Sequence, residues 1–351
     1  MPSCKTATAS TPDAFRSDLP DMRENFSITD YLRTLQERPD VSSNQIRQMI
    51  EYWAAQNDSA AANRLLHALV FKYAATEKQL FRLNRELLDQ QERIHEDLAA
   101  AAEIQRSLLP RRPADYDQFE IAWTFEPSAH IAGDIFNVIR LAEHLWGIYA
   151  LDVSGHGVPA AMVAVSVYQN LQPASGFVCH SDPRRGSEQI PRRPAEVLHA
   201  LDAEYPFERF SNFFSMVYVL LDTQAHTLTY SNAGHPRPVL LRKNGRLKLF
   251  KRGGPFIGLL GIRTPDDDHG FMEEQLIFHP GDKLFLYTDG LNEYADPQGE
   301  MYGKQRLHAL LKDLASEPVA AMVAAVRAAL RQFGRGVAPA DDITLVGFEF
   351  K

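Results

Sequence analysis

The chain has 351 residues, 45% of them hydrophobic, which is enough for one large or two ordinary domains with a sizeable core. Its formal net charge of −8 argues against nucleic acid as the main ligand, because proteins bind phosphate backbones through basic surfaces. Cys4 and Cys179 do not have the spacing of a disulfide framework or of a metal site. No apolar run approaches the ~18 residues of a membrane span, and no signal peptide is visible. We therefore expect a cytoplasmic protein that does not bind membranes.

The first part of the chain predicts a tail followed by helices. Residues 1–25 are rich in Ser, Thr, Pro and Asp, a composition typical of disordered segments. Residues 26–76 carry apolar side chains at helical spacing, and we interpret them as a regulatory region that binds a partner protein. The last helix of this region has Asp58 as a candidate N-cap and meets no Gly or Pro before Pro110. It is therefore expected to continue into the next segment.

Residues 77–110 predict a linker helix that forms a coiled coil. A narrow apolar stripe at steps of three and four residues is surrounded by charged side chains. This pattern favours a two-stranded coil, and hence a homodimer, over a broad core face. The alternative is one long amphipathic helix that lies on its own domain. The stripe consists of Leu80, Leu83, Leu87, Ile94, Leu98, Ala101, Ile104 and Leu108.

Residues 111–351 predict one α+β domain, because strand-like runs with short connections are interrupted by paired helices. The pattern is typical of antiparallel sheets covered by helices, and residues 173–193 are expected to form a loop. Strands are predicted over Phe119–Phe125, Asp134–Leu141, Leu145–Leu151, Phe213–Leu221, Thr227–Ser231, Pro238–Arg242, Leu247–Phe250, Gln275–Phe278, Lys283–Tyr287 and Ile343–Phe350. Helices are predicted over Gly157–Gln172, Pro194–Ala203, Lys304–Leu314 and Pro318–Phe333.

Four aspartates lie at the ends of predicted strands: Asp134, Asp152, Asp289 and Asp341. An acidic group there, next to a glycine that lets backbone come close, suits a shared site for a hard metal ion. Sites made of carboxylates favour Mg²⁺ or Mn²⁺ over zinc, and two such ions ~3.5–4 Å apart lower the pKa of a shared water for in-line attack on a phosphoryl group. Each aspartate alone is better explained as a turn residue. The four together favour the metal site.

Five short motifs carry a resemblance to a known family. They are Ala132–Phe136 (AGDIF), Leu151–Gly157 (LDVSGHG), Asn232–Pro236 (NAGHP), Tyr287–Leu291 (YTDGL) and Asp341–Leu345 (DDITL). In this order they resemble the PPM-type metal-dependent serine/threonine protein phosphatases, in the bacterial RsbU/SpoIIE-like branch. The resemblance extends upstream to Ala102–Pro110 (AEIQRSLLP), which is similar to the linker helix of that family, and covers about residues 100–351.

The resemblance implies a fold and a reaction. The fold is an antiparallel β-sandwich flanked by helices, preceded by the linker helix. The reaction removes phosphate from a serine or threonine of a signalling protein by attack of metal-bound hydroxide, with a pair of Mn²⁺ or Mg²⁺ ions at the site. The implied substrate is a phosphorylated anti-sigma-factor antagonist in a partner-switching stress response, and an upstream regulator is expected on the N-terminal helices.

The resemblance also assigns roles to the aspartates. Asp152 is expected to bridge the two ions, with the carbonyl of Val153 as a second ligand. Asp289 and Asp341 are expected to hold one ion between them. Asp134 would support the site directly or through a metal-bound water. Asp152 and Asp289 would thus act in catalysis through the water that the ions activate.

Two positions depart from the family pattern. Ala132 stands where the family usually has Gly, which is acceptable unless the position needs a positive φ, and Asn137 stands where it usually has Asp. The arginine with which larger members grip the phosphate has no counterpart that we identify, and His130 is a speculative substitute. These departures motivate an alternative function: a phosphatase-like scaffold that is catalytically weak and binds its partner without turnover.

Other assignments for the same motifs were weighed. Asp342 is less favoured than Asp341 as a ligand and is the candidate to cap the turn. His156 is a candidate to protonate the leaving serine alkoxide, although a turn histidine at the helix start is the favoured interpretation. Asp152, Ser154 and His156 contain the residue types of a hydrolase triad, but lie too close in sequence to stack in line. A metal nuclease is disfavoured by the acidic net charge.

Overall fold

The structure is a computed structural model, and it describes residues 59–110, 116–181, 189–260 and 270–351. The chain divides into two compact units, residues 1–93 and 94–351. The predicted tail over residues 1–25 and the first predicted helices lie outside the described residues. Among the described helices, none is long and apolar enough to cross a membrane.

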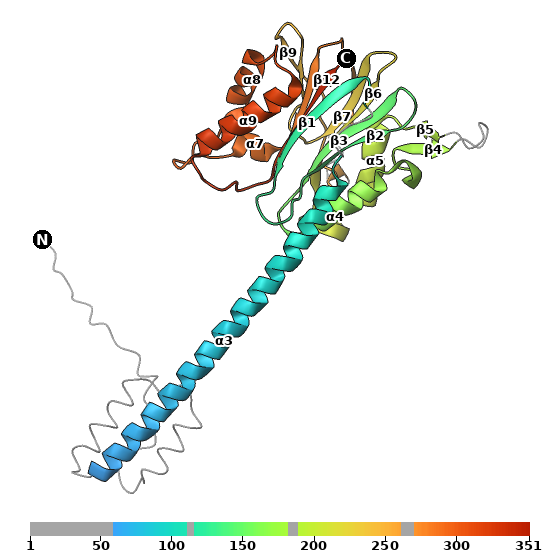
Figure 1. Cartoon of the computed structure of the whole chain (residues 1–351). Helices are drawn as coiled ribbons and strands as arrows, with labels where there is room; N and C mark the ends of the chain where they lie inside the picture. Colours follow the sequence, from blue (N-terminus) through green and yellow to red (C-terminus); the bar gives the residue numbers. More distant parts are fainter. Residues whose placement is uncertain (1–58, 111–115, 182–188, 261–269) are drawn as a thin grey trace, which may run out of the picture. The chain divides into compact units, whose positions relative to one another are not determined.

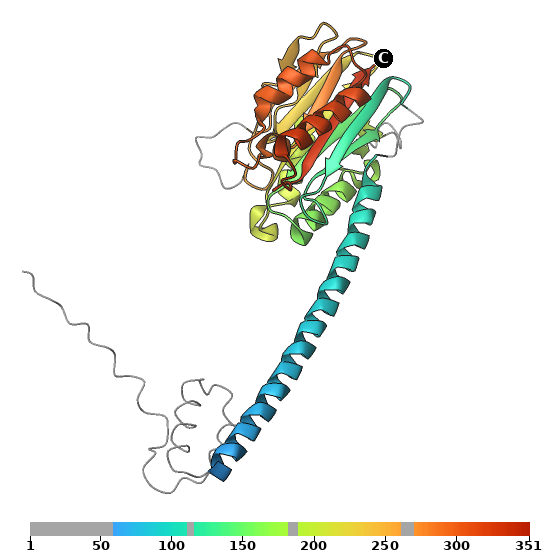
Figure 2. The same ribbon diagram turned by 60° about the vertical axis from the view of Figure 1, so that its left-hand side comes forward.

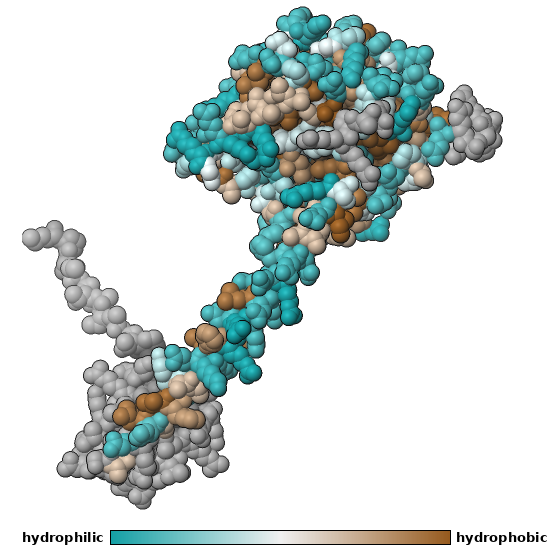
Figure 3. Space-filling view, in the orientation of Figure 1, coloured by the Kyte–Doolittle hydropathy of each residue, from teal (hydrophilic) through white to brown (hydrophobic). Residues whose placement is uncertain are grey.

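The long helix α3 spans Ser59–Leu108, so the prediction of one helix without interruption up to Pro110 is confirmed. Its side chains are exposed along most of its length, including apolar ones that Figure 3 shows on its surface. The prediction of a coiled coil stays a prediction. The exposed apolar side chains that belong to the predicted stripe are Leu80, Leu83, Leu87, Ile94 and Ile104.

Two five-stranded antiparallel sheets form the centre of the second unit, which confirms the predicted fold class (Figures 1 and 2). The first sheet has the order β1 (Phe119–Glu126), β12 (Ile343–Phe350), β11 (Lys283–Tyr287), β8 (Val239–Leu241) and β9 (Leu247–Leu249). The second has the order β10 (Glu273–Ile277), β7 (Thr227–Ala233), β6 (Phe214–Asp222), β3 (Leu145–Val153) and β2 (Ile135–Arg140). Strands β11 and β12 have the bounds that the sequence predicted.

The sheets face each other across a core of apolar side chains, to which Phe348 and Leu284 contribute from the first sheet and Val219 from the second. Helices α4 (Val158–Asn170) and α5 (Pro194–Glu204) pack on the second sheet. Helices α8 (Gly303–Asp313) and α9 (Val319–Gly334) lie over the first (Figure 1). Burying each large apolar side chain in these layers contributes ~1.5–3 kcal/mol. The packed core and its covering helices thus hold the strand ends that carry the aspartates in place.

Several short elements were not predicted. The expected loop over residues 173–193 is wrong in part, because it contains the 3₁₀ turn η1 (Pro173–Ser175) and a small hairpin of β4 (Cys179–Ser181) and β5 (Gln189–Pro191). Helices α6 (Phe207–Phe210) and α7 (Asp289–Glu293) were also missed. Elements of three to five residues are too short to show a period in the sequence.

The last turns of α3 belong to the second unit. Ala102 is buried in a small cluster with Ile131 and Ala161, and Leu98 packs against that cluster. This unit therefore begins at residue 94, earlier than the domain start at 111 that we expected. At the end of the apolar stripe, Leu98 and Ala101 pack against this cluster, whereas Ile104 is exposed.

Candidate metal centre

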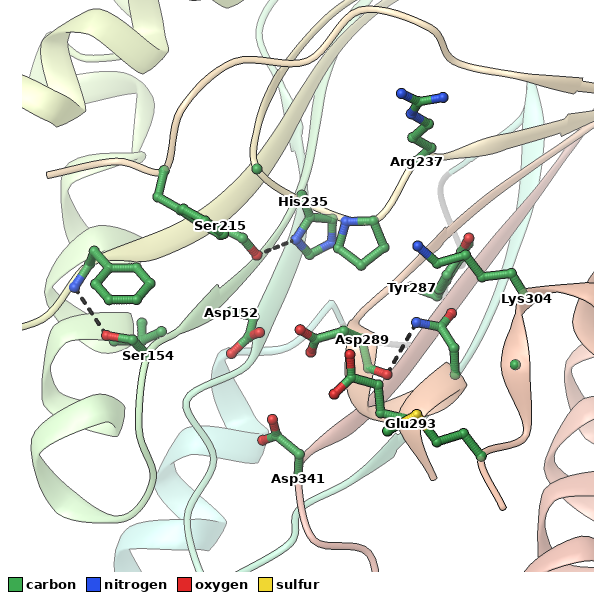
Figure 4. Close-up of a pocket in the computed structure, with 18 of the residues that line it drawn as sticks. Asp152, Ser154, Ser215, His235, Arg237, Tyr287, Asp289, Glu293, Lys304 and Asp341 are labelled. Carbon is green, nitrogen blue, oxygen red and sulfur yellow. Dashed lines mark hydrogen bonds between the residues drawn. The ribbon is translucent and has the colours of Figure 1, made fainter. Parts of the chain in front are cut away.

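Three of the predicted aspartates line one cavity of about 910 Å³, which we call the acidic pocket. Asp152 comes from β3, Asp289 is the first residue of α7, and Asp341 lies two residues before the start of β12. Both sheets therefore contribute to one site. Figure 4 shows the three carboxylates turned toward a common space, with that of Glu293 beside them.

The carboxylates of the acidic pocket raise one another's pKa. Burial is the largest cause that raises the pKa of Asp152 to about 8, followed by the negative charges of Asp289 and Asp341. The pKa values of Asp341 and Glu293 are also raised, first by burial and then by neighbouring carboxylates. A divalent cation bound among these carboxylates would oppose the upward shifts of their pKa values.

Asp134 lies beneath the pocket rather than on its wall, and its side chain is buried. Its Oδ2 accepts hydrogen bonds from the hydroxyls of Thr288 at 2.8 Å and Thr344 at 2.5 Å, while its Oδ1 is buried without a partner. Burial, then the charges of Asp152 and Asp342, raise its pKa well above the ordinary value. The two threonines fix the orientation of this carboxylate and leave its Oδ1 without a hydrogen-bond partner.

Asp342 is engaged in the backbone of the loop that precedes Asp134. Its Oδ1 accepts from the amide and the hydroxyl of Ser128 at 2.7 and 2.9 Å, and its Oδ2 accepts from the amide of Gly133 at 2.7 Å. Of the acidic pair, Asp341 lines the pocket and Asp342 caps the loop. The choice of Asp341 over Asp342 as a metal ligand stays a prediction.

Two glycines let backbone approach the site closely. A Cβ on Gly133 would lie 2.9 Å from the carbonyl oxygen of Val153, the backbone oxygen expected to be a ligand. A Cβ on Gly290 would overlap the carbonyl of Asp342. A side chain at either position would push apart the segments that carry the aspartates.

The residues of the acidic pocket fit a hard divalent cation. Within the described ranges, no three His, Cys, Asp or Glu side chains lie close enough together to hold a metal ion as they stand. The donors are nevertheless all oxygen, as Mg²⁺ and Mn²⁺ prefer. Asp134 and Asp289 each have a buried Oδ1 without a hydrogen-bond partner. Unpaired buried oxygens and raised carboxylate pKa values are what a cation would relieve.

The two departures from the family motif do not disturb the carboxylates. Ala132 is fully buried and is not among the non-glycine residues with positive φ, so the position accepts a side chain. Asn137 accepts a hydrogen bond from the amide of Val138 and does not line the acidic pocket. His130 does not line the acidic pocket, and its Nε2 lies 2.9 Å from that of His95.

The Asp152–Ser154–His156 triad does not form. The hydroxyl of Ser154 accepts from the amide of Phe213 at 3.1 Å, and His156 is exposed and not on the pocket wall. His156 does influence the site, because its charge lowers the pKa of Asp341. It stays a candidate proton donor at the rim.

The sequence did not identify the cations of the pocket wall, although His235 on the same wall belongs to the motif Asn232–Pro236. Arg237, before β8, and Lys304, at the start of α8, place cations on its wall (Figure 4). His235 is buried with its Nδ1 2.7 Å from the hydroxyl of Ser215, and burial lowers its pKa to about 3, so this imidazole is neutral. The cations had no signal in the sequence, because they lie outside the aspartate motifs and reach the pocket only through the fold.

Comparisons with known proteins place this geometry in a family. Residues 142–351 match the model of the family described as Stage II sporulation protein E (SpoIIE). The chain is 28% identical over 224 residues to phosphoserine phosphatase RsbP of Bacillus subtilis (strain 168), covering 64% of this chain and 50% of RsbP. It is 24% identical over 215 residues to phosphoserine phosphatase RsbU of the same organism, covering 60% of this chain and 57% of RsbU. The chain thus spans about half the length of these relatives.

Solved structures share the fold. The SiaA-PP2C domain of Pseudomonas aeruginosa superposes with a TM-score of 0.60 at 24% identity, covering 74% of this chain and 98% of that domain. The RsbU and RsbW domains of a Mycobacterium tuberculosis protein give a TM-score of 0.53 at 22% identity, covering 69% of this chain and 62% of that structure. With its five motifs, its paired sheets and the family match over most of the second unit, the chain belongs to the SpoIIE family, in the RsbU/SpoIIE-like branch of the PPM-type phosphatases.

Proposed function

We propose that the chain is a Mn²⁺- or Mg²⁺-dependent phosphatase that removes phosphate from a serine or threonine of a cytoplasmic signalling protein. The observation that carries the proposal is the convergence of Asp152, Asp289 and Asp341 on one pocket with raised carboxylate pKa values. A pair of divalent ions, when bound there, would lower the pKa of a water molecule and neutralise phosphoryl oxygens.

The chain's own residues divide the remaining work. Asp152 would lie between the ions, next to the carbonyl of Val153, and Asp289 and Asp341 would hold one ion from the opposite side. Arg237 and Lys304 are on the pocket wall, and neither has an ion pair among the described residues. They would orient the phosphate oxygens.

Two residues near the rim complete the proposed reaction. His156, near Asp341, would give a proton to the leaving serine oxygen. Asp134, held by two threonine hydroxyls, would support the ions with its free oxygen. Neither residue lines the acidic pocket in the structure, so each would act at its edge or from beneath it.

The test is the release of phosphate from p-nitrophenyl phosphate and from a phosphoserine protein, with Mn²⁺ and with EDTA. Asp152→Ala and Asp289→Ala should abolish the metal-dependent activity while the circular dichroism spectrum stays unchanged. If both folded variants keep wild-type turnover, the proposal is wrong. The alternative is a scaffold without turnover. It is supported by the finding that, within the described ranges, no three His, Cys, Asp or Glu side chains lie close enough together to hold a metal ion. Calorimetric titration with Mn²⁺ followed by the same assay separates the two.

The proposed substrate is a phosphorylated anti-sigma-factor antagonist. The support is the similarity to RsbP and RsbU, which are phosphoserine phosphatases by name. Incubation of the enzyme with phosphorylated candidates encoded in the same genome tests this assignment. If all of these candidates stay phosphorylated while another phosphoserine protein is a good substrate, the substrate assignment is wrong and that other protein is the better candidate.

We further propose that the linker helix forms a homodimer and that regulators act through it. Leu80, Leu83 and Leu87 follow the spacing of a coiled-coil seam, and each is at least half exposed in the single chain. A regulator bound to the N-terminal helices would shift the equilibrium of this coil. Removal of residues 1–93, which leaves the second unit whole, should give a monomer with altered activity, as measured by light scattering and phosphate release. An unchanged oligomeric state and activity would refute this part.

A further inference from the structure

A second cavity of about 980 Å³ lies beside the acidic pocket and has the opposite charge. We call it the basic groove, and it is formed by the β8–β9 hairpin and the turn before β11. Among the described residues that line it, Asp282 is the one acidic side chain, in a chain whose net charge is −8. Six basic side chains line it: Arg237, Arg242, Lys243, Arg246, Lys248 and Lys251.

Hydrogen bonds and an ion pair engage Asp282, whereas three of the basic side chains of the groove have no ion pair with a described residue. Asp282 is 2% exposed and accepts from Arg242 Nη1 at 2.6 Å, from the amide of Lys243 at 3.1 Å and from the amide of His279 at 2.8 Å. The charge of Asp282 is therefore neutralised by Arg242 and by backbone amides. The side chains of Lys243, Arg246 and Lys251 are exposed and have no ion pair with any described residue.

The groove is continuous with the acidic pocket, because Arg237 and Leu249 line both cavities. A ligand that places a phosphate against Arg237 in the acidic pocket would extend directly into the groove. Leu247, Leu249 and Pro280 add apolar surface to the lining, and none of the described lining residues is a Phe, Tyr or Trp on which a nucleic-acid base would stack. A peptide with acidic side chains matches this combination of charge and apolar contact.

We propose that the basic groove binds an acidic segment that flanks the phosphorylated residue of the protein substrate. The inference rests on the proposed phosphatase function for the phosphate itself, and it adds the feature of the substrate that this chain selects. Flanking charge would act through encounter rate and KM rather than through the chemical step, because the groove lies beside the reacting atoms.

The probes are two fluorescent phosphoserine peptides, one with Asp and Glu on both sides of the phosphoserine and one with Gln and Asn at those positions. Binding is measured by anisotropy in EDTA, where no turnover is expected. The test variant is Arg246→Glu/Lys251→Glu, and Arg246→Gln/Lys251→Gln is a milder version in case charge reversal disturbs folding. The control is Arg140→Glu/Arg335→Glu, which reverses two exposed cations outside both cavities.

The acidic peptide should bind more tightly than the neutral one, and the test variant should weaken its binding by about tenfold, the size expected for two exposed charge pairs. With Mn²⁺, the same variant should raise KM for the acidic peptide by a similar factor, with unchanged kcat and unchanged hydrolysis of p-nitrophenyl phosphate. The control variant should behave like wild type.

Equal affinity for the two peptides, or tighter binding of an oligothymidine or of phosphatidylglycerol vesicles than of the acidic peptide, would overturn the proposal. The outcome is independent of the proposed function. If the acidic peptide binds through Arg246 and Lys251 but no phosphate is released with Mn²⁺, the groove stands and the phosphatase proposal fails. If both peptides are dephosphorylated and bind equally, the phosphatase proposal stands and the groove proposal fails.

Discussion

The side-chain amide of Gln105 forms two hydrogen bonds with the backbone of Ala132: Nε2 donates to its carbonyl at 2.7 Å, and Oε1 accepts from its amide at 2.9 Å. Gln105 is a buried residue near the end of α3, and Ala132 lies two residues before Asp134. The next residue, Gly133, donates its amide to Asp342. The end of the linker helix is thus bonded directly to the loop that carries a proposed metal-supporting aspartate.

Replacing Gln105 with Leu should weaken both stability and metal binding. The change leaves the buried amide and carbonyl of Ala132 without partners, which costs ~1–3 kcal/mol for each group. We expect a lower free energy of unfolding in urea and weaker Mn²⁺ binding by calorimetry. Gln105→Glu, which keeps the acceptor but loses the donor, should fall between Leu and wild type.

Ser107→Ala is the matched control, since Ser107 is an exposed residue of the same helix end that bonds only to the carbonyl of Ile104. It should leave Mn²⁺ affinity unchanged. Loss of stability in Gln105→Leu with full retention of Mn²⁺ affinity would show that the bridge supports the fold but does not position the metal site.

The metal-free protein should lose stability as the pH rises. Burial and the charges of Asp289 and Asp341 raise the pKa of Asp152 from 3.8 to about 8. Between these values the folded state holds a proton that the unfolded state releases, so the free energy of unfolding falls with increasing pH, by up to ~1.4 kcal/mol per pH unit for one group.

Urea unfolding in EDTA from pH 5 to pH 8 measures this slope, and Asp152→Asn should flatten it because the variant has no proton to lose. Mn²⁺ should bind more tightly as the pH rises, since the ligands must give up protons. A slope that is the same in wild type and in Asp152→Asn would mean that Asp152 is ionised in the metal-free protein.

The strands and the aspartate cluster could be read from the sequence for a physical reason. Apolar runs such as Lys283–Tyr287 and Ile343–Phe350 are buried along their length, so pattern and structure share the same bounds. The aspartates lie at or near the ends of such runs. Arg237 and Lys304 could not be predicted in this way, because a cation on a connection leaves no period and only tertiary structure brings it to the pocket. The short helix α7 was missed for a similar reason, although its first residue, Asp289, was identified.

The threonines that hold Asp134 should be needed for metal binding. The hydroxyls of Thr288 and Thr344 lower the pKa of Asp134, against the larger effect of burial. Thr344→Val keeps the shape but removes a donor, so the pKa of Asp134 should rise further and Mn²⁺ affinity should fall. Thr344→Ser, which keeps the hydroxyl, should bind Mn²⁺ almost as wild type does.

A double-mutant cycle checks that the threonine acts through the aspartate. The effect of Thr344→Val on Mn²⁺ affinity should largely disappear in an Asp134→Asn background, because the two side chains share one hydrogen bond. Additive losses of affinity would contradict this role and would assign the effect of Thr344 to the packing of β12.

Gly290→Ala should separate the two aspartate-bearing segments. A Cβ at this position overlaps the carbonyl of Asp342, and the start of α7 cannot move away without shifting Asp289. Strain from overpacking of this kind typically costs ~1–3 kcal/mol. Because the displacement falls on a proposed ligand, the loss of Mn²⁺-dependent turnover should exceed what the lower stability explains.

Gly253→Ala is the control, since a Cβ there meets no atom within 4 Å and the backbone needs no positive φ. Thermal unfolding measures the loss of stability in both variants. Phosphate release is then measured at a temperature where both variants are folded. An active Gly290→Ala protein would mean that the Asp289 and Asp342 segments do not need their close approach.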